Sequence, residues 1–345
     1  MLKRWKKPWI NEKQFNDLLK RVSIILENSK IIVIAYQNTG ANWLGVKTAT
    51  KGMFPDNVVL LPQSYSSSLL SISQKETLIE YIISNGVQTV IFSGIPNYIL
   101  KWIKQFHSKS IKTGIIYHGG FAELNGNKEK QKNFQIIKDY SQKGIINKIG
   151  VVKEGLDVWF QLNSKAQVHR VCPTFSIPSK LDISNYSDGK IHIGVFGNST
   201  YNKNRHTQVA AAALINNSVI HILSPNEFDY LLPTNRIVVH NNLNRTQFLS
   251  LLGSMDLNLY CSLSESWGQV ILESIALKTP CLFSNNSGIE KFVGNEFLVS
   301  EYDNPNSIYI KANEVLNLNK FSLSDSDLHK IEKKINYCNM SFINS

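Results

Sequence analysis

The chain has 345 residues, 43% of them hydrophobic, and a formal net charge of +11 at pH 7. This length exceeds the usual size of one compact core and favours two domains of about 150 residues each. No apolar run approaches the roughly 20 residues that span a bilayer, and no secretory signal pattern is found, so the sequence excludes a helical membrane span and predicts a cytoplasmic protein.

The sequence contains four cysteines, namely Cys172, Cys261, Cys281 and Cys338. They lie far apart and lack the paired spacing of metal sites. We therefore expect reduced and mostly buried thiols.

The first 30 residues form a basic arm and helix with eight Lys or Arg against three Asp or Glu. Residues 1–9 interleave four cations with Trp5 and Trp9. Cations attract anionic lipid head groups and tryptophans favour the membrane interface, which makes this arm a candidate contact with an anionic membrane surface. A locally packed basic terminus explains the same residues equally well. Residues 12–27 have apolar side chains at helical spacing and predict an amphipathic helix.

Residues 31–175 alternate apolar runs of strand length with helical patterns, as is typical of a parallel α/β sheet. The predicted strands are 31–36, 58–61, 89–92, 113–117, 145–152 and 168–171. The predicted helices are one that ends near residue 51, followed by 75–84, 98–107, 130–143 and 155–162. This pattern predicts an N-terminal Rossmann-like domain.

Residues 176–189 are polar, include a proline and predict a linker. Strand and helix patterns then resume over 190–320, which predicts a second Rossmann-like domain. The predicted strands are 191–196, 219–223, 236–240, 257–260 and 280–283, and the predicted helices are 207–215, 246–253, 269–277 and 304–318. Residues 321–345 contain an amphipathic helix, predicted over about 325–336, that is a candidate to cross back to the first domain.

The turn after the first predicted strand contains Gly40. In a doubly wound domain, the turn at this position commonly meets phosphate or sugar. The turn lacks a paired-glycine motif, so Gly40 is either part of a diphosphate site or a glycine that the turn itself requires.

His118 follows the strand 113–117, at the carboxyl edge where such domains bind ligands. An imidazole near neutral pH can donate to or accept from a sugar hydroxyl. A purely structural histidine is the alternative. Glu123, a few residues later, is a further candidate for contact with an acceptor.

A glycine turn follows the strand 191–196 and contains Lys203 and Arg205. Two cations before a helix suit a diphosphate, because they supply charge and hydrogen-bond donors where negative charge accumulates. The turn is therefore a candidate diphosphate site.

A second candidate diphosphate site lies at the start of the helix 269–277. The first N–H groups of a helix lack intrahelical partners and favour an anion. This makes the backbone around Trp267, Gly268 and Gln269 a phosphate-binding candidate, with Gly268 allowing close approach. Glu265 precedes this helix and Glu273 lies inside it, and two carboxylates beside a phosphate site suit sugar hydroxyls.

The region around this helix resembles the signature of retaining GT-B glycosyltransferases of family 4. That signature has a Glu, a small–aromatic–Gly turn, a second Glu after seven intervening residues, a Thr-Pro strand and a Gly-rich loop. The matching residues here are Glu265, Ser266-Trp267-Gly268, Glu273, Thr279-Pro280 and Asn285-Asn286-Ser287-Gly288-Ile289. In that family, an Arg also follows the strand before the phosphate site, with a Lys about five residues later. Lys203 matches the Lys, whereas Asn198 stands in place of the Arg and leaves Arg205 as the candidate substitute.

The resemblance implies a GT-B fold, with two Rossmann-like domains, and transfer of a sugar from a UDP- or GDP-sugar to a hydroxyl acceptor with retention. It implies that Lys203 and the amides near Gly268 hold the diphosphate, that Glu265 and His118 act on the sugar as catalytic residues, and that Glu273 binds the ribose or nearby hydroxyls. A glycan or lipid-linked glycan acceptor in bacterial surface polysaccharide synthesis is expected, on the inner face of the cell membrane if the basic arm binds lipid.

Other functions remain open from the sequence. An inverting transferase or an epimerase has the same fold, and a non-catalytic glycan- or partner-binding subunit fits the missing Arg at Asn198. We expect no obligatory metal or other cofactor. The positive charge also suits nucleic acid, but the sequence lacks a nucleic-acid-binding motif and we expect no such partner.

Overall fold

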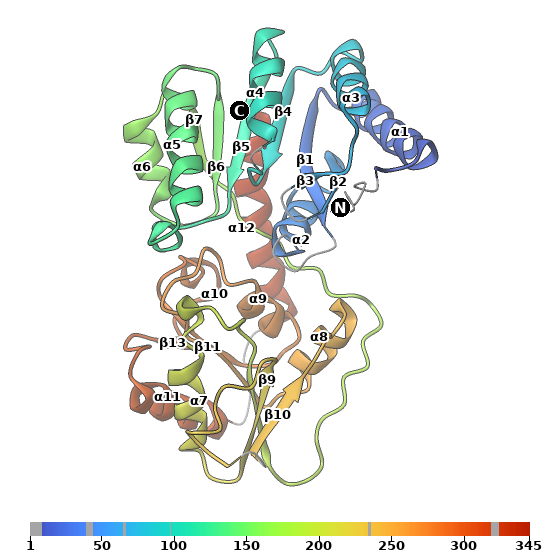
Figure 1. Ribbon diagram of the computed structural model, residues 1–345. Helices are drawn as coiled ribbons and strands as arrows, with labels where there is room; N and C mark the ends of the chain where they lie inside the picture. Colours follow the sequence, from blue (N-terminus) through green and yellow to red (C-terminus); the bar gives the residue numbers. More distant parts are fainter. Residues whose placement is uncertain (1–8, 39–43, 65–66, 97, 234–235, 319–323) are drawn as a thin grey trace, which may run out of the picture. The chain divides into compact units, whose positions relative to one another are not determined.

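The structure is a computed structural model that describes residues 9–38, 44–64, 67–96, 98–233, 236–318 and 324–345. The chain divides into two compact units. Unit 1 comprises Met1–Pro173 with Ile335–Ser345, and unit 2 comprises Thr174–Lys334. Each unit is an α/β domain built on one mainly parallel sheet (Figure 1). No helix in the described ranges is long and apolar enough to cross a membrane.

The sheet of unit 1 has seven strands in the order β3-β2-β1-β4-β5-β6-β7, all parallel except β3, which pairs antiparallel with β2. The central strand β4 is buried at every position, as expected for a strand covered on both faces. The strand bounds are β1 Ile31–Asn38, β2 Val58–Ser64, β3 Ser67–Ser68, β4 Thr89–Ser93, β5 Lys112–Tyr117, β6 Lys148–Val151 and β7 Gln167–Arg170.

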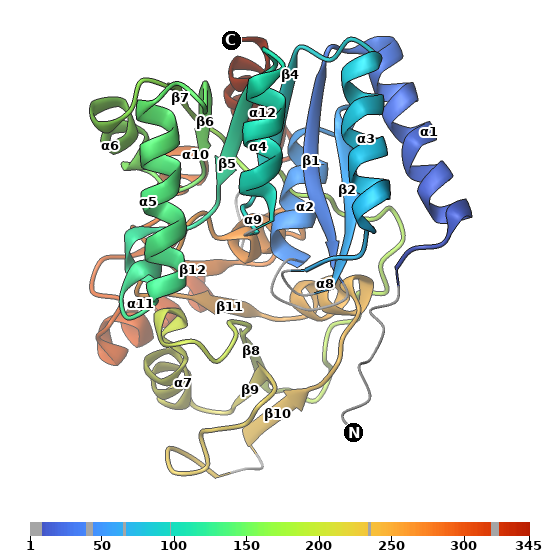
Figure 2. The ribbon, with the colours of Figure 1, turned by 45° about the horizontal axis from the view of Figure 1, so that its top comes forward.

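The helices of unit 1 cover both faces of this sheet. Figure 2 shows α3, α4 and α5 in front of the strands and the end of α12 behind them. A capping box between Asn11 and Gln14 begins α1, which buries one apolar face of five side chains. The bounds are α1 Glu12–Asn28, α2 Leu44–Met53, α3 Ile72–Ser84, α4 Ile99–Ser108, η2 Phe121–Leu124, α5 Lys128–Gln142 and α6 Leu156–Asn163.

The last helix, α12 (Asp325–Asn344), ends inside unit 1. The Asn339 side chain bonds the backbone N–H and carbonyl of Cys172, both at 2.9 Å. The ammonium of Lys148 donates to the carbonyl of Phe342 at 2.9 Å, and the Phe342 ring lies where a side chain at Gly150 would clash. These contacts fix the C-terminal residues to strand β6 and to the segment that follows β7.

The sheet of unit 2 has six parallel strands in the order β10-β9-β8-β11-β12-β13. The strand bounds are β8 Ile191–Val195, β9 Ser218–Leu223, β10 Ile237–His240, β11 Leu257–Tyr260, β12 Cys281–Ser284 and β13 Leu298–Val299. The helix bounds are η3 Tyr201–Lys203, α7 Arg205–Ala213, α8 Arg245–Gly253, α9 Gln269–Ala276, α10 Glu290–Val293 and α11 Pro305–Asn317. This strand order places a topological switch point between β8 and β11, where doubly wound sheets bind ligands.

A row of histidines ties the segment before β8 to this sheet. His192 Nδ1 bonds His221 Nε2 at 2.8 Å, and His221 Nδ1 bonds His240 Nε2 at 2.9 Å. The other nitrogen of His192 bonds Asp188 at 2.9 Å, and the Tyr186 ring stacks on His192 with centroids 3.7 Å apart. The predicted linker therefore packs on unit 2 in this structure.

The structure confirms the predicted fold class and nearly all predicted strands and helices. The periodicity of the sequence missed the short elements β3, η2, η3, α10 and β13, because two to four residues carry too little pattern. The helix predicted near 325–336 is longer than expected and reaches Asn344.

Candidate functional site

Two loops at the switch point of unit 2 are held together by their own hydrogen bonds. The loop after β8 and the loop after β11 meet where Asn202 O accepts from Leu263 N at 2.8 Å. Asn204 Nδ2 donates to Cys261 O at 3.0 Å, and Gln208 Oε1 accepts from Cys261 N at 2.8 Å. Adjacent parallel strands end at the same edge, so these bonds bring side chains from both loops to one place.

Lys203, Glu265 and Tyr260 form a cluster at this edge. The Lys203 ammonium pairs with Glu265 Oε2 and donates to the Tyr260 hydroxyl at 2.9 Å, and that hydroxyl donates to Glu265 Oε2 at 2.9 Å. The side chains of Lys203 and Glu265 are 14% and 16% exposed, so both groups remain within reach of a ligand. Gly197 permits the arrangement, because a Cβ there would lie 2.9 Å from Lys203 Cβ.

The protonation states in this cluster follow from burial and charge. Burial alone would lower the pKa of Lys203, but Tyr260 and Glu265 outweigh it and the net effect raises this pKa. Burial, followed by the charge of Glu265, raises the pKa of Tyr260. At neutral pH the cluster therefore holds an ammonium and a neutral phenol.

The start of α9 lies directly after this cluster. Gly268 caps the helix in the left-handed region at φ 88°, where a Cβ would also meet Ile271 Cδ1 at 2.5 Å. Trp267 is buried and its ring lies edge-on to Phe292 at 5.1 Å. Gln269 donates from Nε2 to Thr174 O at 2.9 Å. The side chains of Trp267 and Gln269 thus hold the turn in place, and the helix start offers its N–H groups to an anion.

Glu273 lies one turn inside α9 and is fully buried. Its two carboxylate oxygens accept from Arg245, with Nη1 to Oε2 at 3.0 Å and Nη2 to Oε1 at 2.5 Å. Arg245 is the first residue of α8, and a capping box between Asn244 and Gln247 fixes the start of that helix. Arg245 could not be predicted from the sequence as a partner of Glu273, because this pairing depends on how α8 packs against α9.

Arg205 lies away from the Lys203 cluster. Its guanidinium donates from Nη2 to Leu223 O at 2.9 Å and to Pro225 O at 3.0 Å. Nη1 pairs with Glu227 at 3.3 Å, the side chain is 1% exposed, and burial lowers its pKa. These contacts hold the Arg205 guanidinium against the loop after β9, and its role in place of the missing cation stays a prediction.

The Asn198 side chain forms hydrogen bonds within the turn that contains it. Its Oδ1 accepts from Thr200 N at 3.2 Å and from Thr200 Oγ1 at 2.5 Å. Such a side-chain turn is a common role of asparagine. The position is exposed.

In unit 1, His118 follows β5 and bonds Ser93 at the end of β4 through Nε2 at 2.8 Å. Ser93 Oγ in turn meets Thr50 Oγ1 at 2.5 Å, and Thr50 donates to Val46 O at 2.7 Å. Because the single Thr50 proton is used there, Ser93 donates to Thr50 and His118 Nε2–H donates to Ser93. Burial lowers the His118 pKa to about 4, which leaves a neutral ring with Nδ1 as an acceptor.

Residues 180–326 match the family profile of Glycosyl transferases group 1. This part of the chain is similar to the group 1 glycosyltransferases. A search among curated proteins finds no significant match to the chain. Solved structures share the fold across both units, and the three described below are 10–14% identical to this chain in sequence.

The sucrose-phosphate synthase of Thermosynechococcus elongatus is similar with a TM-score of 0.64 at 14% identity, over 95% of this chain and 92% of that one. HepE from Anabaena, solved in complex with UDP and glucose, has a TM-score of 0.67 at 10% identity, over 91% and 99%. WaaG, a glycosyltransferase involved in lipopolysaccharide biosynthesis, has a TM-score of 0.58 at 12% identity, over 90% and 95%. These likenesses confirm the predicted GT-B fold.

Unit 2 thus brings together Lys203, Glu265 and the start of α9, and it places Glu273 in a separate ion pair. Gly40 and residues 1–8 lie outside the described residues. Glu123 pairs with Lys130 at 2.7 Å on the surface of unit 1. Among the residues that the structure describes, no group of three or more His, Cys, Asp or Glu could hold a metal ion.

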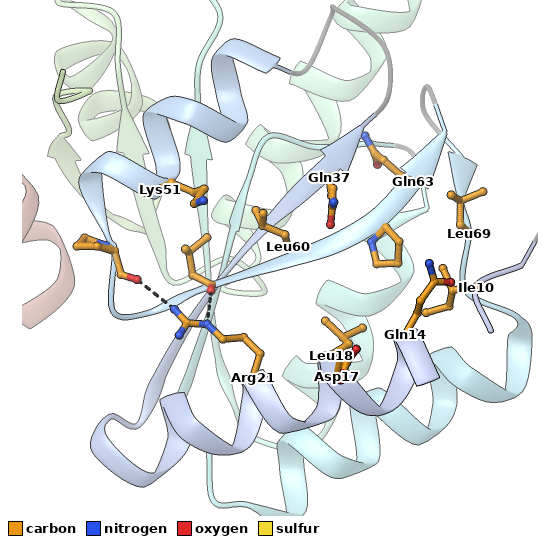
Figure 3. Close-up of a pocket in the computed structure, with 13 residues that line it drawn as sticks. Ile10, Gln14, Asp17, Leu18, Arg21, Gln37, Lys51, Leu60, Gln63 and Leu69 are labelled. Atoms are coloured by element: carbon orange, nitrogen blue, oxygen red, sulfur yellow. Dashed lines mark hydrogen bonds between the residues drawn. The ribbon is translucent and has the colours of Figure 1, made fainter. Parts of the chain in front are cut away.

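Unit 1 of this glycosyltransferase fold also contains a cavity of about 670 Å³ at the β2 edge of its sheet (Figure 3). Its wall combines apolar side chains of α1 and β2 with Arg21 and Lys51. Arg21 donates to Pro55 O at 3.1 Å and to Val58 O at 3.4 Å, as the dashed lines mark. None of the site residues predicted from the sequence lines this cavity.

Proposed function

We propose that this protein transfers a sugar from a nucleotide-sugar donor, a UDP- or GDP-sugar, to a hydroxyl acceptor with retention at the anomeric carbon. The observation that carries the proposal is the cluster of Lys203, Glu265 and Tyr260 beside the start of α9, at the switch point of a unit similar to the group 1 glycosyltransferases. A cation, a row of backbone N–H groups and a carboxylate at one edge are suited to a sugar diphosphate.

In this proposal, the Lys203 ammonium and the N–H groups at the start of α9 stabilise the charge that develops on the leaving diphosphate. Such preorganised donors are often the largest catalytic contribution. Because Glu265 now holds the ammonium, the incoming diphosphate shares or replaces that contact and leaves Glu265 to accept from sugar hydroxyls. Retention follows the family signature around Glu265 and Glu273, and no carboxylate needs to act as a covalent nucleophile.

In unit 1, His118 offers Nδ1 as an acceptor to a substrate hydroxyl. Its Nε2–H is committed to Ser93, so the ring cannot donate to a substrate without giving up that bond. Replacing Ser93 with Ala removes the group that fixes the ring. We expect turnover to fall in that variant while nucleotide affinity in unit 2 is unchanged.

The acceptor that we propose is a glycan or lipid-linked glycan of a bacterial surface polysaccharide. WaaG, which has the same fold, is itself involved in lipopolysaccharide biosynthesis. The basic arm 1–9 supports a place at an anionic membrane surface. Deleting residues 1–9 is expected to reduce sedimentation of the protein with anionic liposomes, and an unchanged bound fraction would reject this part of the proposal.

The function is tested with a panel of UDP-, GDP-, ADP- and CMP-sugars. Thermal stabilisation of the chain reports binding, since a ligand that binds the native state raises its stability by mass action. Slow release of nucleotide by hydrolysis then reports turnover. We expect one donor class to respond and Glu265→Gln to retain its binding but lose hydrolysis. Hydrolysis at the normal rate in Glu265→Gln would contradict the catalytic role.

A second candidate is a non-catalytic subunit with this fold that binds a nucleotide sugar or a glycan. It is favoured by the exposed Asn198 in place of an Arg and by the internal use of Arg205. This candidate predicts binding of a donor or glycan with no hydrolysis and no transfer to any acceptor. Turnover that disappears with Glu265→Gln would exclude it.

A further inference from the structure

The two side chains of the Arg245–Glu273 pair differ in solvent exposure. The Glu273 side chain is 1% exposed, whereas that of Arg245 is 36% exposed. Both carboxylate oxygens already accept from the guanidinium, at 3.0 Å and 2.5 Å. The Arg245 side chain is therefore accessible from solvent, whereas the Glu273 carboxylate is covered.

Opening the pair would be unfavourable. It would leave a buried carboxylate without its cation, and the neutral hydroxyls of a ribose are weaker donors than a bidentate guanidinium. The pair is also held from both ends, because Glu273 lies inside α9 and Arg245 sits at the capped start of α8. The pair is therefore expected to stay closed when a nucleotide binds.

We propose that Arg245 is the residue of this pair that contacts the donor nucleotide and that Glu273 acts as its positioning residue. This rests on the proposed function, which brings a nucleoside diphosphate to the same edge of the sheet. A guanidinium only donates, so it selects acceptor atoms of the nucleotide, namely ribose, base carbonyl or phosphate oxygens. Unit 2 thereby has a guanidinium for the nucleotide although Asn198 stands where an Arg is usual.

The proposal is tested by calorimetric titration of the full chain with UDP, with GDP and with their 2′,3′-dideoxy analogues. The variant Glu273→Gln keeps the shape of the carboxylate and one acceptor for Arg245. It is expected to bind the diphosphate within about fivefold of the unmodified protein and to keep the same ratio between ribose and dideoxyribose ligands. A direct contact of Glu273 with the ribose hydroxyls would instead make that ratio fall toward one.

The double variant Arg245→Met with Glu273→Met removes both charges and avoids an uncompensated buried carboxylate. It is expected to fold and to lose about tenfold or more in diphosphate affinity. The matched control is Lys311→Met with Glu314→Met, which neutralises a surface ion pair of unit 2 and is expected to bind as the unmodified protein does. Circular dichroism of each variant confirms that it is folded.

Either of two results would overturn the role of Arg245 without contradicting the proposed function. One is normal diphosphate affinity in the double variant Arg245→Met with Glu273→Met, and the other is loss of the ribose preference in Glu273→Gln. Failure of the unmodified protein to bind any nucleoside diphosphate would contradict the proposed function itself, and the role of Arg245 with it. The two failures are therefore distinguishable.

Discussion

Two ion pairs of unit 2, Lys203–Glu265 and Arg245–Glu273, each contain a glutamate of the family signature but differ in how they are buried. In the Lys203–Glu265 pair both side chains are exposed by similar amounts, 14% and 16%, and Tyr260 completes the contact. In the Arg245–Glu273 pair the carboxylate is 1% exposed and the cation 36%. The first pair can exchange partners with a ligand, whereas the second keeps its carboxylate inside the protein.

This difference shows that two glutamates of one sequence signature need not act in the same way. Water or a phosphate can solvate Lys203 and Glu265 when they separate, so that the cost of separation is modest. Glu273 has no such alternative, because a buried carboxylate without its cation is strongly unfavourable. The free energy of unfolding of variants in each pair tests this difference.

The largest effect is expected for Arg245→Ala. Removing the cation leaves the Glu273 carboxylate buried and uncompensated, which typically costs about 3–5 kcal/mol in the free energy of unfolding. Lys203→Ala is expected to cost less, about 1–3 kcal/mol, because Glu265 is 16% exposed and keeps some contact with water. Urea unfolding of both variants measures the difference. Equal losses would mean that the two pairs are buried alike and would remove the basis of the comparison.

Most of the site could be predicted from the sequence, because the residues that carry it are close to strand ends or helix starts. Lys203, Glu265 and the turn at Gly268 follow apolar runs that are recognisable as strands β8 and β11. The partner of Glu273 could not be predicted, since Arg245 is 28 residues away and the two helices meet only after the sheet has formed.

Two further features could not be predicted from the sequence, because they also depend on contacts between segments that are far apart in the chain. The row of His192, His221 and His240 depends on the register of three parallel strands, in which each histidine lies two residues further along than the one before. The internal role of Arg205 depends on the loop after β9. Spacing within one segment carries no information about either contact.

Lowering the pH is expected to destabilise the protein through the row of His192, His221 and His240. Burial, followed by His240 and His192, lowers the His221 pKa to about 3, while Asp188 opposes this shift. The unfolded chain then binds more protons than the folded one between about pH 6.5 and 3, so stability falls as the pH is lowered. The slope for this one group is up to about 1.4 kcal/mol per pH unit.

The variant His221→Gln, which lacks the titrating ring, tests this expectation. Its free energy of unfolding, measured by urea at a series of pH values, should vary less between pH 7 and 4 than that of the unmodified protein. Parallel curves would show that the acid sensitivity comes from other groups and that His221 is not the residue responsible.

A smaller effect is expected for Gly268→Ala, which tests the turn between the two pairs. A Cβ at φ 88° is strained and would meet Ile271 at 2.5 Å, so we expect a loss of about 1–2 kcal/mol. Gly126→Ala is the matched control, because Gly126 is also in the left-handed region but has nothing within 4 Å of a Cβ. A loss at Gly268 no greater than at Gly126 would argue against close packing of this turn.

The most direct measurement is the affinity of the chain for UDP and GDP in unmodified, Lys203→Ala and Lys278→Ala protein. Lys278 is an exposed lysine of unit 2 and serves as the control for loss of one positive charge. We predict that one diphosphate binds, that Lys203→Ala weakens it by about tenfold or more, and that Lys278→Ala leaves it unchanged. Equal affinity in all three proteins would contradict a diphosphate site at the Lys203–Glu265 pair.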